Sequence, residues 1–538
     1  MIQDNLLLIL SLLFTISMLT MLSSKVKIPY PIFLVIGGIL ISLVPGIPNI
    51  SLQPELVFLI FLPPLLYAAA WNTSWKDFWR LRRPITMLGF GLVIFTSAAV
   101  ALVSNAIIPE FPLAYGFLLG GIISPPDAVA ATSVLQGLKA PKRVVTILEG
   151  ESLVNDAASL IVFRFAVAAV LTGQFEITAA TKTFFLVAIL GIAIGLGIAL
   201  IVFAIHRFLP TTPAIDAGIT LITPYIMYVA AEHFHYSGVL SVVTGGLFLT
   251  YHSHHLFSYE SRLNVLSLWE TLIFLLNGFV FILIGLELPI IMHGLGDYSV
   301  SEAILYAVII SLVTILIRII WVFPGAYLPR LLSKKIRDRE PNPGWKGTFL
   351  VAWSGMRGVV SLASALAVPL MLTNGEAFPH RNLILFITFV VIIITLVLQG
   401  LSLRPLIRIL NIEEKEKDSA ETQSHLLRIQ LAETVLSFID TNYSQQVSSI
   451  ETYKRVRDRY ERMIEVTKKR LENDDPTEET VNFYLPLYRK MLVEVVDVRR
   501  QELNRARASG EFSEELIRER ERELDLEEAR LKTMRTRN

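Results

Sequence analysis

The chain has 538 residues, 53% of them hydrophobic, and a mean hydropathy of +0.56. Soluble domains are rarely this apolar, so the composition predicts an all-α membrane protein that lies in a lipid bilayer. The net charge is only +1 and no cluster of basic residues indicates a nucleic-acid partner, while the absence of cysteine excludes disulfides and thiolate metal sites.

Apolar segments of transmembrane length follow one another through residues 1–410. We predict about thirteen membrane-spanning helices from them, because a helix needs ~20 apolar residues to cross a bilayer. The predicted spans are 4–23, 28–47, 54–71, 84–108, 112–136, 144–172, 181–206, 214–233, 236–251, 265–291, 302–325, 346–371 and 382–403. Residues 1–5 contain no Lys or Arg, so the first span is expected to be a retained helix rather than a cleaved signal peptide.

Lys and Arg are distributed unevenly between the loops that connect these spans. With thirteen spans, the loops predicted to lie inside contain nearly all of these residues, and those predicted to lie outside contain only Lys182 and Arg381. Such a bias marks the cytoplasmic side. We therefore expect a multi-pass protein of the cell membrane, with its N-terminus outside and its C-terminus in the cytoplasm.

The fifth and twelfth segments contain residues that interrupt a helix. Pro125 and Pro126 remove two backbone donors just before Asp127, and glycines flank Arg357 in the twelfth segment. The two segments are seven apart and so run in opposite directions. Their order predicts inverted repeats of helices 1–6 and 8–13, with helices 5 and 12 broken and crossed near the membrane midplane.

The sixth segment places carboxylates within an otherwise apolar helix. Glu151 and Asp156 lie at or inside the span, and Asn155 directly precedes Asp156. An ionisable group at this depth costs at least ~2.5 kcal/mol on insertion scales, so it commonly marks an ion path or a buried pair. At a helical rise of ~1.5 Å per residue, Asp156 lies near the predicted depth of Asp127 and Arg357.

A carboxyl group in a membrane cavity can exchange a proton for a metal ion. Burial disfavours the charged carboxylate, which lets H⁺ compete with a hard cation for the same oxygen. One carboxylate that exchanges one H⁺ for one Na⁺ moves no net charge, so an Asn at position 155, where an Asp could titrate, favours electroneutral exchange. The candidate ligands for the ion and the proton are Asp156, Asn155, Asp127, Ser152, Ser159, Thr132 and carbonyls freed by the prolines.

Four motifs resemble those of a known family. GESLVNDA at 150–157, FLPPLLY at 61–67, the region of Asp127, and GMRGVVS at 355–361 occur in the expected order and cover nearly the whole membrane part. In these motifs the chain resembles the monovalent cation:proton antiporters, and most closely their electroneutral sodium/proton exchanger branch, which holds bacterial Na⁺/H⁺ antiporters. Each motif alone is moderately specific, and the set of four is specific.

The resemblance implies a transporter rather than an enzyme, without a cofactor, and a homodimer in which a six-helix core moves as an elevator against separate dimerisation helices. Asp156 would bind the cation and the proton, with Asn155 beside it. Arg357 would be a structural cation in the crossed helix, paired with Glu151. Asp127 would help to neutralise the crossing helix ends.

Two positions depart from the family pattern. Pro126 stands where many relatives have a threonine, which removes one candidate ligand. Tyr67 stands where many relatives have an acidic residue, so the third helix is not expected to supply a charged ligand.

Other interpretations of the charged residues stay open. Asp156 could be a structural carboxylate paired with an arginine, and Asp127 could serve the helix break alone. Arg318 also lies within a predicted span, as a structural charge whose candidate partners are Glu149 and Asp127. The histidines within 251–255 fit either a polar loop or a pH sensor.

The leading functional hypothesis is a secondary active antiporter that exchanges Na⁺, or Li⁺ or K⁺, for H⁺ by alternating access. A K⁺/H⁺ exchanger is the alternative in the same class. A cation channel would instead carry current without coupling to protons. A membrane hydrolase would use Asp127 and Asp156 as an acid pair, which the Asn-Asp pattern of the sixth segment does not require.

Residues 411–538 differ in composition from the membrane part. They are rich in Glu, Arg, Lys and Leu and poor in Gly and Pro. Breakers at 474–476 and 509–510 divide this tail into about four amphipathic helices. We expect a cytoplasmic helical regulatory domain, with a mostly disordered tail as the alternative.

Overall fold

The computed structural model describes most of the chain, and nearly all of it is helical. The described residues are 2–26, 28–44, 54–135, 140–173, 177–296, 298–339, 342–372, 374–410, 415–471, 491–492, 494–506 and 514–533. Within these ranges the β-type pairing is a single isolated bridge between Met371 and Ala377. The chain divides into two compact units, Met1–Glu414 and Lys415–Asn538.

The first half of the first unit contains a long run of helices. They are α1 (Ile2–Val26), α2 (Tyr30–Ser42), α3 (Pro54–Asn72), α4 (Trp75–Arg80), α5 (Arg82–Thr86), the π-helix η1 (Met87–Leu92), α6 (Val93–Ile107), α7 (Leu113–Ile123), α8 (Ala128–Leu135), α9 (Lys142–Thr172) and α10 (Ile177–Phe208). Because α5, η1 and α6 follow without a gap, residues 82–107 form one continuous helical span.

The second half of this unit is built in the same way. Its helices are α11 (Pro213–His233), α12 (Gly238–Leu256), α13 (Tyr259–Leu286), α14 (Leu288–His293), α15 (Val300–Leu332), α16 (Lys334–Arg339), α17 (Trp345–Trp353), α18 (Val359–Leu366), α19 (Arg381–Ile394), the π-helix η2 (Thr395–Gln399) and α20 (Gly400–Leu410). The histidine segment 251–255 is the end of α12 rather than a loop.

Nine helices in the described part of the chain are long and apolar enough to cross a membrane. They span Leu6–Val26, Arg82–Ile107, Leu113–Leu135, Lys142–Thr172, Phe185–Phe208, Pro213–His233, Tyr259–Leu286, Val300–Leu332 and Arg381–Leu410, and two shorter apolar helices span Tyr30–Ser42 and Leu59–Asn72. These helices confirm the prediction of an all-α membrane protein. The count of thirteen spans stays a prediction.

Two helices are interrupted where the sequence predicts a break. α7 ends before Pro125 and Pro126, whose missing N–H groups remove two helical hydrogen bonds, and α8 begins directly after Asp127. α17 and α18 are likewise separated by residues 354–358. The two gaps touch, because the backbone N–H of Asp127 donates a 2.7 Å hydrogen bond to the carbonyl of Met356.

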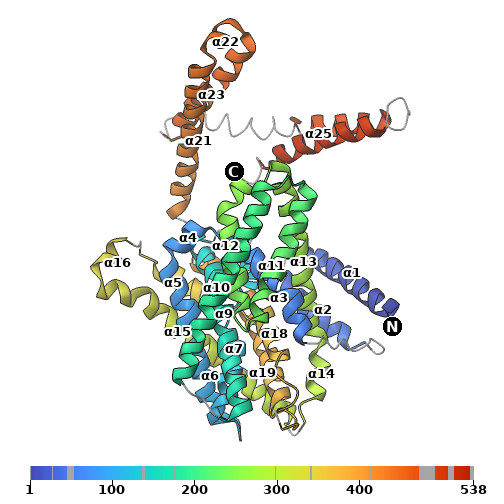
Figure 1. Cartoon of the computed structure of the whole chain (residues 1–538), viewed down its shortest axis with the longest axis vertical. Coiled ribbons are helices and arrows are strands. Elements are labelled where there is room, and N and C mark those ends of the chain that lie inside the picture. The colour runs from blue at the N-terminus through green and yellow to red at the C-terminus, as the bar shows by residue number, and fades with distance from the viewer. Residues whose placement is uncertain are drawn as a thin grey trace. The chain divides into compact units, whose positions relative to one another are not determined.

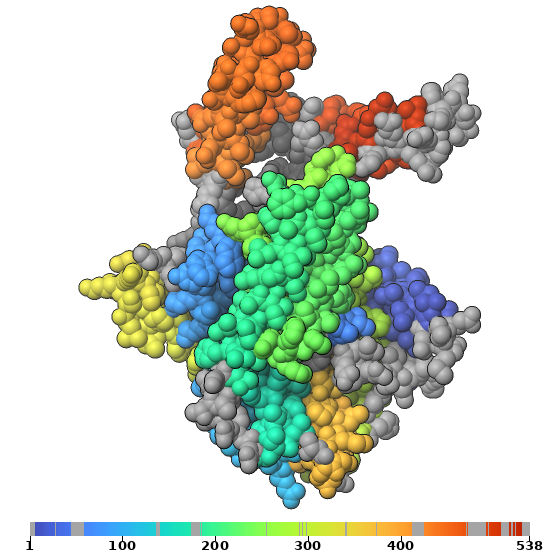
Figure 2. Space-filling view, viewed as in Figure 1, coloured from blue at the N-terminus to red at the C-terminus, as the bar shows by residue number. Residues whose placement is uncertain are grey.

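The most extensive helix contacts of the first unit fall within two bundles. The site bundle comprises α5–α9, α15 and α17–α20 with η1 and η2, and the flanking bundle comprises α1–α3 and α10–α13. On the face shown in Figure 2, α10, α11 and α12 form a continuous part of the surface. Contacts of α3 with α9 and α18 join the two bundles, and the three helices meet in the middle of the unit (Figure 1).

Small residues bring the helices of the site bundle close together. A Cβ atom at Gly120 of α7 would lie 2.6 Å from the Cα atom of Ser97 on α6, and one at Gly116 would lie 2.6 Å from the Cα atom of Ala101. Only glycine permits this backbone contact, which is common between membrane helices. The packing fixes α7, and therefore the break that follows it, against α6.

The described residues of the second unit are helical except for Tyr443 and Ile450, which connect its helices. Its helices are α21 (Lys415–Asn442), α22 (Ser444–Ser449), α23 (Glu451–Leu471) and α25 (Glu514–Thr533), and residues 491–492 and 494–506 are also helical. α21 packs against α23, and Arg457 Nε lies 2.9 Å from Asp440 Oδ1 between them. The breakers predicted at 474–476 lie outside the described residues, as do those at 509–510.

Candidate functional site

A small cavity lies where α3 and α9 meet the two helix gaps. Its volume is about 50 Å³, which suits an ion or a few waters rather than an organic substrate. Its polar side chains belong to Asp127, Ser152, Asp156, Asn277 and Ser361. The cavity thus brings together residues from α9, α13, α18 and the α7–α8 gap.

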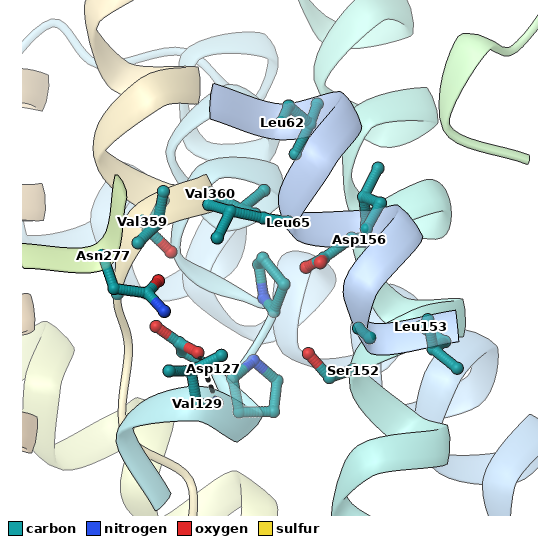
Figure 3. A pocket seen from close by; sticks show the side chains of 16 residues that line it. Leu62, Leu65, Asp127, Val129, Ser152, Leu153, Asp156, Asn277, Val359 and Val360 are labelled. Atoms are coloured by element: carbon teal, nitrogen blue, oxygen red, sulfur yellow. Dashed lines mark hydrogen bonds between the residues drawn. The ribbon is translucent and has the colours of Figure 1, made fainter. Parts of the chain in front are cut away.

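Asp156 supplies a carboxylate to the cavity from the middle of α9. Its side chain is 7% exposed and points into the cavity, while Asp127 and Asn277 approach from the opposite side (Figure 3). Ser152 precedes Asp156 by four residues and so lies on the same face of the helix. Its Oγ lies 3.5 Å from the backbone nitrogen of Ala128, at the start of α8.

Asn155 lies beside Asp156 rather than on the cavity wall. It is fully buried, and its Nδ2 donates a 3.2 Å hydrogen bond to the carbonyl of Pro126, in the α7–α8 gap. The carbonyl released by the helix break is therefore bound by this amide. Among the described residues, Asn155 Oδ1 finds no hydrogen-bond partner.

Two predicted ligands do not reach the cavity. The hydroxyl of Ser159 donates to the carbonyl of Asp156 at 3.0 Å, within its own helix. The hydroxyl of Thr132 donates to the carbonyl of Ala128 at 2.8 Å in α8. Both hydroxyl groups are bound to the backbone of their own helix, which is a common local choice for these residues. Neither residue lines the cavity, and their role as ion ligands stays a prediction.

Asp127 lies at the N-terminal ends of two half-helices. Its Oδ1 accepts hydrogen bonds from the backbone N–H groups of Val129 and Ala130, at 2.8 and 3.4 Å, and the N–H of Val359 at the start of α18 faces the same carboxylate. Helix N-termini favour negative charge. Gly358 is required here, because a Cβ atom at that position would lie 1.9 Å from Asp127 Oδ2.

Arg357 lies at the opposite ends of the interrupted helices. Its side chain donates to the carbonyl of Ile123, at the end of α7, at 3.0 Å, and to the carbonyl of Gly355, just beyond α17. Its backbone N–H donates at 3.1 Å to the hydroxyl of Thr395, in the π-helix η2. The guanidinium of Arg357 therefore faces two helix C-termini, and the carboxylate of Asp127 faces two helix N-termini. Together the two charges balance the dipoles of all four half-helices.

The predicted pairing of Glu151 with Arg357 is wrong. Glu151 instead forms a bidentate ion pair with Arg318 of α15, with distances of 2.5 and 2.8 Å, and both side chains are almost completely buried. Neither Glu149 nor Asp127, the partners considered for Arg318, takes this place. Arg318 also donates to the carbonyl of Val351, in α17, so the pair holds three helices of the site bundle together.

The sequence did not identify two oxygen-bearing side chains of the cavity. Asn277 of α13 and Ser361 of α18 are each 1% exposed, and within the described residues neither Asn277 Oδ1 nor Ser361 Oγ has a hydrogen-bond partner. An unpaired buried oxygen costs ~1–3 kcal/mol, which a bound cation would recover. Two features of the sequence could have identified them: Asn277 is a lone amide in an apolar span, and Ser361 is the last residue of the GMRGVVS motif.

The third helix contributes apolar side chains to the cavity. Leu62 and Leu65 of α3 cover it (Figure 3). Tyr67, where many relatives were expected to have an acidic residue, is 1% exposed and packs against Trp269 with ring centroids 5.1 Å apart. In this chain α3 therefore closes the cavity with leucines and keeps Tyr67 in the apolar core of the flanking bundle.

The cavity has the chemistry of a small oxygen-lined cation site. It combines a carboxylate, hydroxyl groups and an amide, which are the ligands that hard cations prefer. In the part of the chain that the structure describes, no group of three or more His, Cys, Asp or Glu side chains is placed to hold a metal ion.

Comparison with known proteins assigns the membrane part to one family model. The model for the transmembrane part of sodium/hydrogen exchangers matches residues 9–409. An uncharacterised Na⁺/H⁺ exchanger of Mycobacterium tuberculosis is 31% identical over 517 residues, which cover 95% of this chain and 93% of that protein.

Two other curated relatives are longer than the region that they share with this chain. The sodium, potassium, lithium and rubidium/H⁺ antiporters of Bacillus pumilus and Bacillus subtilis are 34% and 35% identical over 402 and 383 residues. These matches cover 73% and 69% of this chain, and 59% and 56% of the two antiporters. The chain thus spans less than two thirds of the length of these relatives.

A solved structure shows the same fold. The sodium proton antiporter MjNhaP1 from Methanocaldococcus jannaschii superposes with a TM-score of 0.61, and the match covers 74% of this chain and 99% of that one. Sequence identity is 20%, so this likeness concerns the fold alone.

Proposed function

The chain belongs to the sodium/hydrogen exchanger family, as its motifs predict, and on that basis we propose that it is a secondary active antiporter exchanging a monovalent cation for H⁺ across the cell membrane. The observation that carries this proposal is the carboxylate of Asp156 in a small, oxygen-lined membrane cavity. Such a group can hold a proton or a cation but not both, which couples the two fluxes.

We propose that Asp156 is the exchange site, with Ser152, Asn277 and Ser361 as further oxygen ligands. Asp127 and Arg357 keep the interrupted helices in place, and Asn155 orients the break rather than titrating. With one exchangeable carboxylate, one H⁺ leaves for each Na⁺ that enters the site, so exchange is electroneutral. Asp127 is available as a weaker ion contact because its carboxylate also lines the cavity.

Alternating access would move the site bundle against the flanking bundle as an elevator. The cavity lies at the contact between these bundles, and the interrupted helices would cross at the same place as equivalent parts of two inverted repeats. We propose that α2, α3, α12 and the interrupted pair α17–α18 are the four further spans of the predicted thirteen. We also propose that the N-terminus lies outside, that the protein is a homodimer and that the second unit is a cytoplasmic regulatory domain.

Na⁺ is the proposed main substrate, with K⁺ as the alternative. The names of the Bacillus relatives include potassium, lithium and rubidium as well as sodium, which favours a site of broad cation preference. A cavity of about 50 Å³ also admits ions of different radius.

The experiment that tests this function uses purified protein in lipid vesicles that contain a pH-sensitive dye. Addition of Na⁺, Li⁺ or K⁺ with the membrane potential clamped should move protons against the cation flux, and the rate should not change with the potential. Protein-free vesicles are the control. A cation current that persists without a proton flux would identify a channel, and a dependence on the potential would contradict electroneutral exchange.

Replacing Asn277 with Leu should weaken cation binding. Loss of one oxygen ligand of ordinary strength, ~1–1.5 kcal/mol, raises the half-saturating Na⁺ concentration about tenfold. The matched control is Asn264→Leu, at an exposed position of the same helix. The dye assay measures both variants over a range of Na⁺ concentrations. Unchanged half-saturation in Asn277→Leu would remove this residue from the ligand set.

A further inference from the structure

A second cavity lies next to the candidate cation site. Its volume is about 380 Å³, and it is walled by α9 on one side and by α3, α10, α11 and α12 on the other. Leu59 lines it on α3, three residues before Leu62 of the small cavity, and Leu160 lines it on α9, four residues after Asp156. The two cavities are therefore about one helical turn, ~5 Å, apart along the same contact between the bundles.

An ion pair stands in the wall of this larger cavity. Arg164 Nη2 of α9 lies 2.6 Å from both carboxylate oxygens of Glu232 at the end of α11. Glu232 also accepts a 3.1 Å hydrogen bond from the backbone N–H of Gly238, at the start of α12. Arg164 belongs to the site bundle and Glu232 to the flanking bundle, so this pair links the two.

The environment of this pair differs from that of the Glu151–Arg318 pair. The side chains of Arg164 and Glu232 are 45% and 28% exposed, whereas those of Glu151 and Arg318 are at most 1% exposed. The buried pair lies within one bundle and would leave two unsolvated charges if it opened. The Arg164–Glu232 pair borders the larger cavity and is less completely buried, so it can open and close at a lower cost than the Glu151–Arg318 pair.

We propose that the Arg164–Glu232 pair is a latch between the two bundles, and that the larger cavity is the vestibule through which cations reach Asp156 from that side. The inference rests on the proposed antiport, because alternating access displaces one bundle against the other. α9 carries both Asp156 and Arg164, so a displacement of α9 that re-exposes the site also separates Arg164 from Glu232. The pair therefore stabilises one end state of the cycle and opens in each turnover.

The absence of cysteine from the chain allows a direct test. In the variant R164C/E232C, a reducible crosslinker that reacts with two thiols should join the bundles. The crosslinker needs a spacer, because the Cα atoms of an Arg–Glu pair lie farther apart than a direct disulfide can span. We expect crosslinking to lower Na⁺/H⁺ exchange at least tenfold in the vesicle assay and reduction to restore it. The matched control is D77C/K142C, a partly exposed pair whose helices α4 and α9 pack together without the flanking bundle.

The outcomes separate the latch from the antiport. Undiminished exchange in crosslinked R164C/E232C would overturn the latch, as would an equal loss in crosslinked D77C/K142C. If the double-cysteine variant is inactive before crosslinking, the charge swap R164E/E232R decides: it should exchange faster than either reversal alone, and equal rates would overturn the latch. Absence of exchange in the unmodified protein would instead refute the proposed function.

Discussion

Replacing Asp156 with Asn should reduce cation-driven proton movement by at least about 100-fold, equivalent to ~2.7 kcal/mol. The amide keeps the size of the side chain but neither binds an exchangeable proton nor presents a negative charge to a cation. Because Asp156 lines the cavity from a regular part of α9, the change should leave the fold intact. The measurement is the dye response of reconstituted vesicles to Na⁺, with thermal unfolding in detergent as the check on folding.

The matched control is Asp216→Asn, which removes another buried carboxylate from a predicted span. Asp216 is 2% exposed and lies 2.8 Å from His206 Nδ1, away from the cavity wall. The Asp216→Asn variant should retain most of the exchange, because the amide has the size of the carboxylate and can still hydrogen-bond. Exchange that persists in Asp156→Asn, or that is lost equally in both variants, would show that Asp156 is not the exchange site.

The central features of the candidate site could be predicted because each breaks a local rule for membrane helices. Adjacent prolines at 125 and 126 remove two helical hydrogen bonds and so favour a break, although Pro63 and Pro64 lie within the continuous helix α3. A carboxylate such as Asp156 is costly within an apolar span. Both conclusions need only the neighbouring residues and the helical rise. The sequence therefore placed the helix break and the carboxylate at the same depth, where the structure has the cavity.

Side-chain partners could not be predicted, because depth does not determine the direction in which a residue points. Arg357 was the predicted partner for Glu151, but α17 packs against both α9 and α15, and Glu151 pairs with Arg318, which is 167 residues distant. Similarly, Asn277 and Ser159 both lie in apolar spans. Only the packed structure shows that Asn277 faces the cavity while Ser159 turns back to its own helix.

Breaking the Glu151–Arg318 pair should cause the largest loss of stability. In Glu151→Gln the charge of Arg318 stays buried without its counterion, which typically costs 3–5 kcal/mol. The double variant E151L/R318M removes both charges and replaces them with apolar side chains of similar length, so it should be closer in stability to the unmodified protein than either single variant. Thermal unfolding of the four proteins in the same detergent measures the coupling between the two positions.

Glu232→Gln is the control, because it breaks an Arg–Glu pair that is partly exposed. The pair borders the larger cavity and is only partly buried, so this change should cost only ~0–1 kcal/mol, although it affects the proposed latch. If Glu151→Gln were as mild as Glu232→Gln, Arg318 would not depend on Glu151, and Glu151 would become a candidate ion ligand. A large loss in the single variant that the double variant recovers would instead show that the pair holds α9 and α15 in register, and so positions Asp156 without touching the cation.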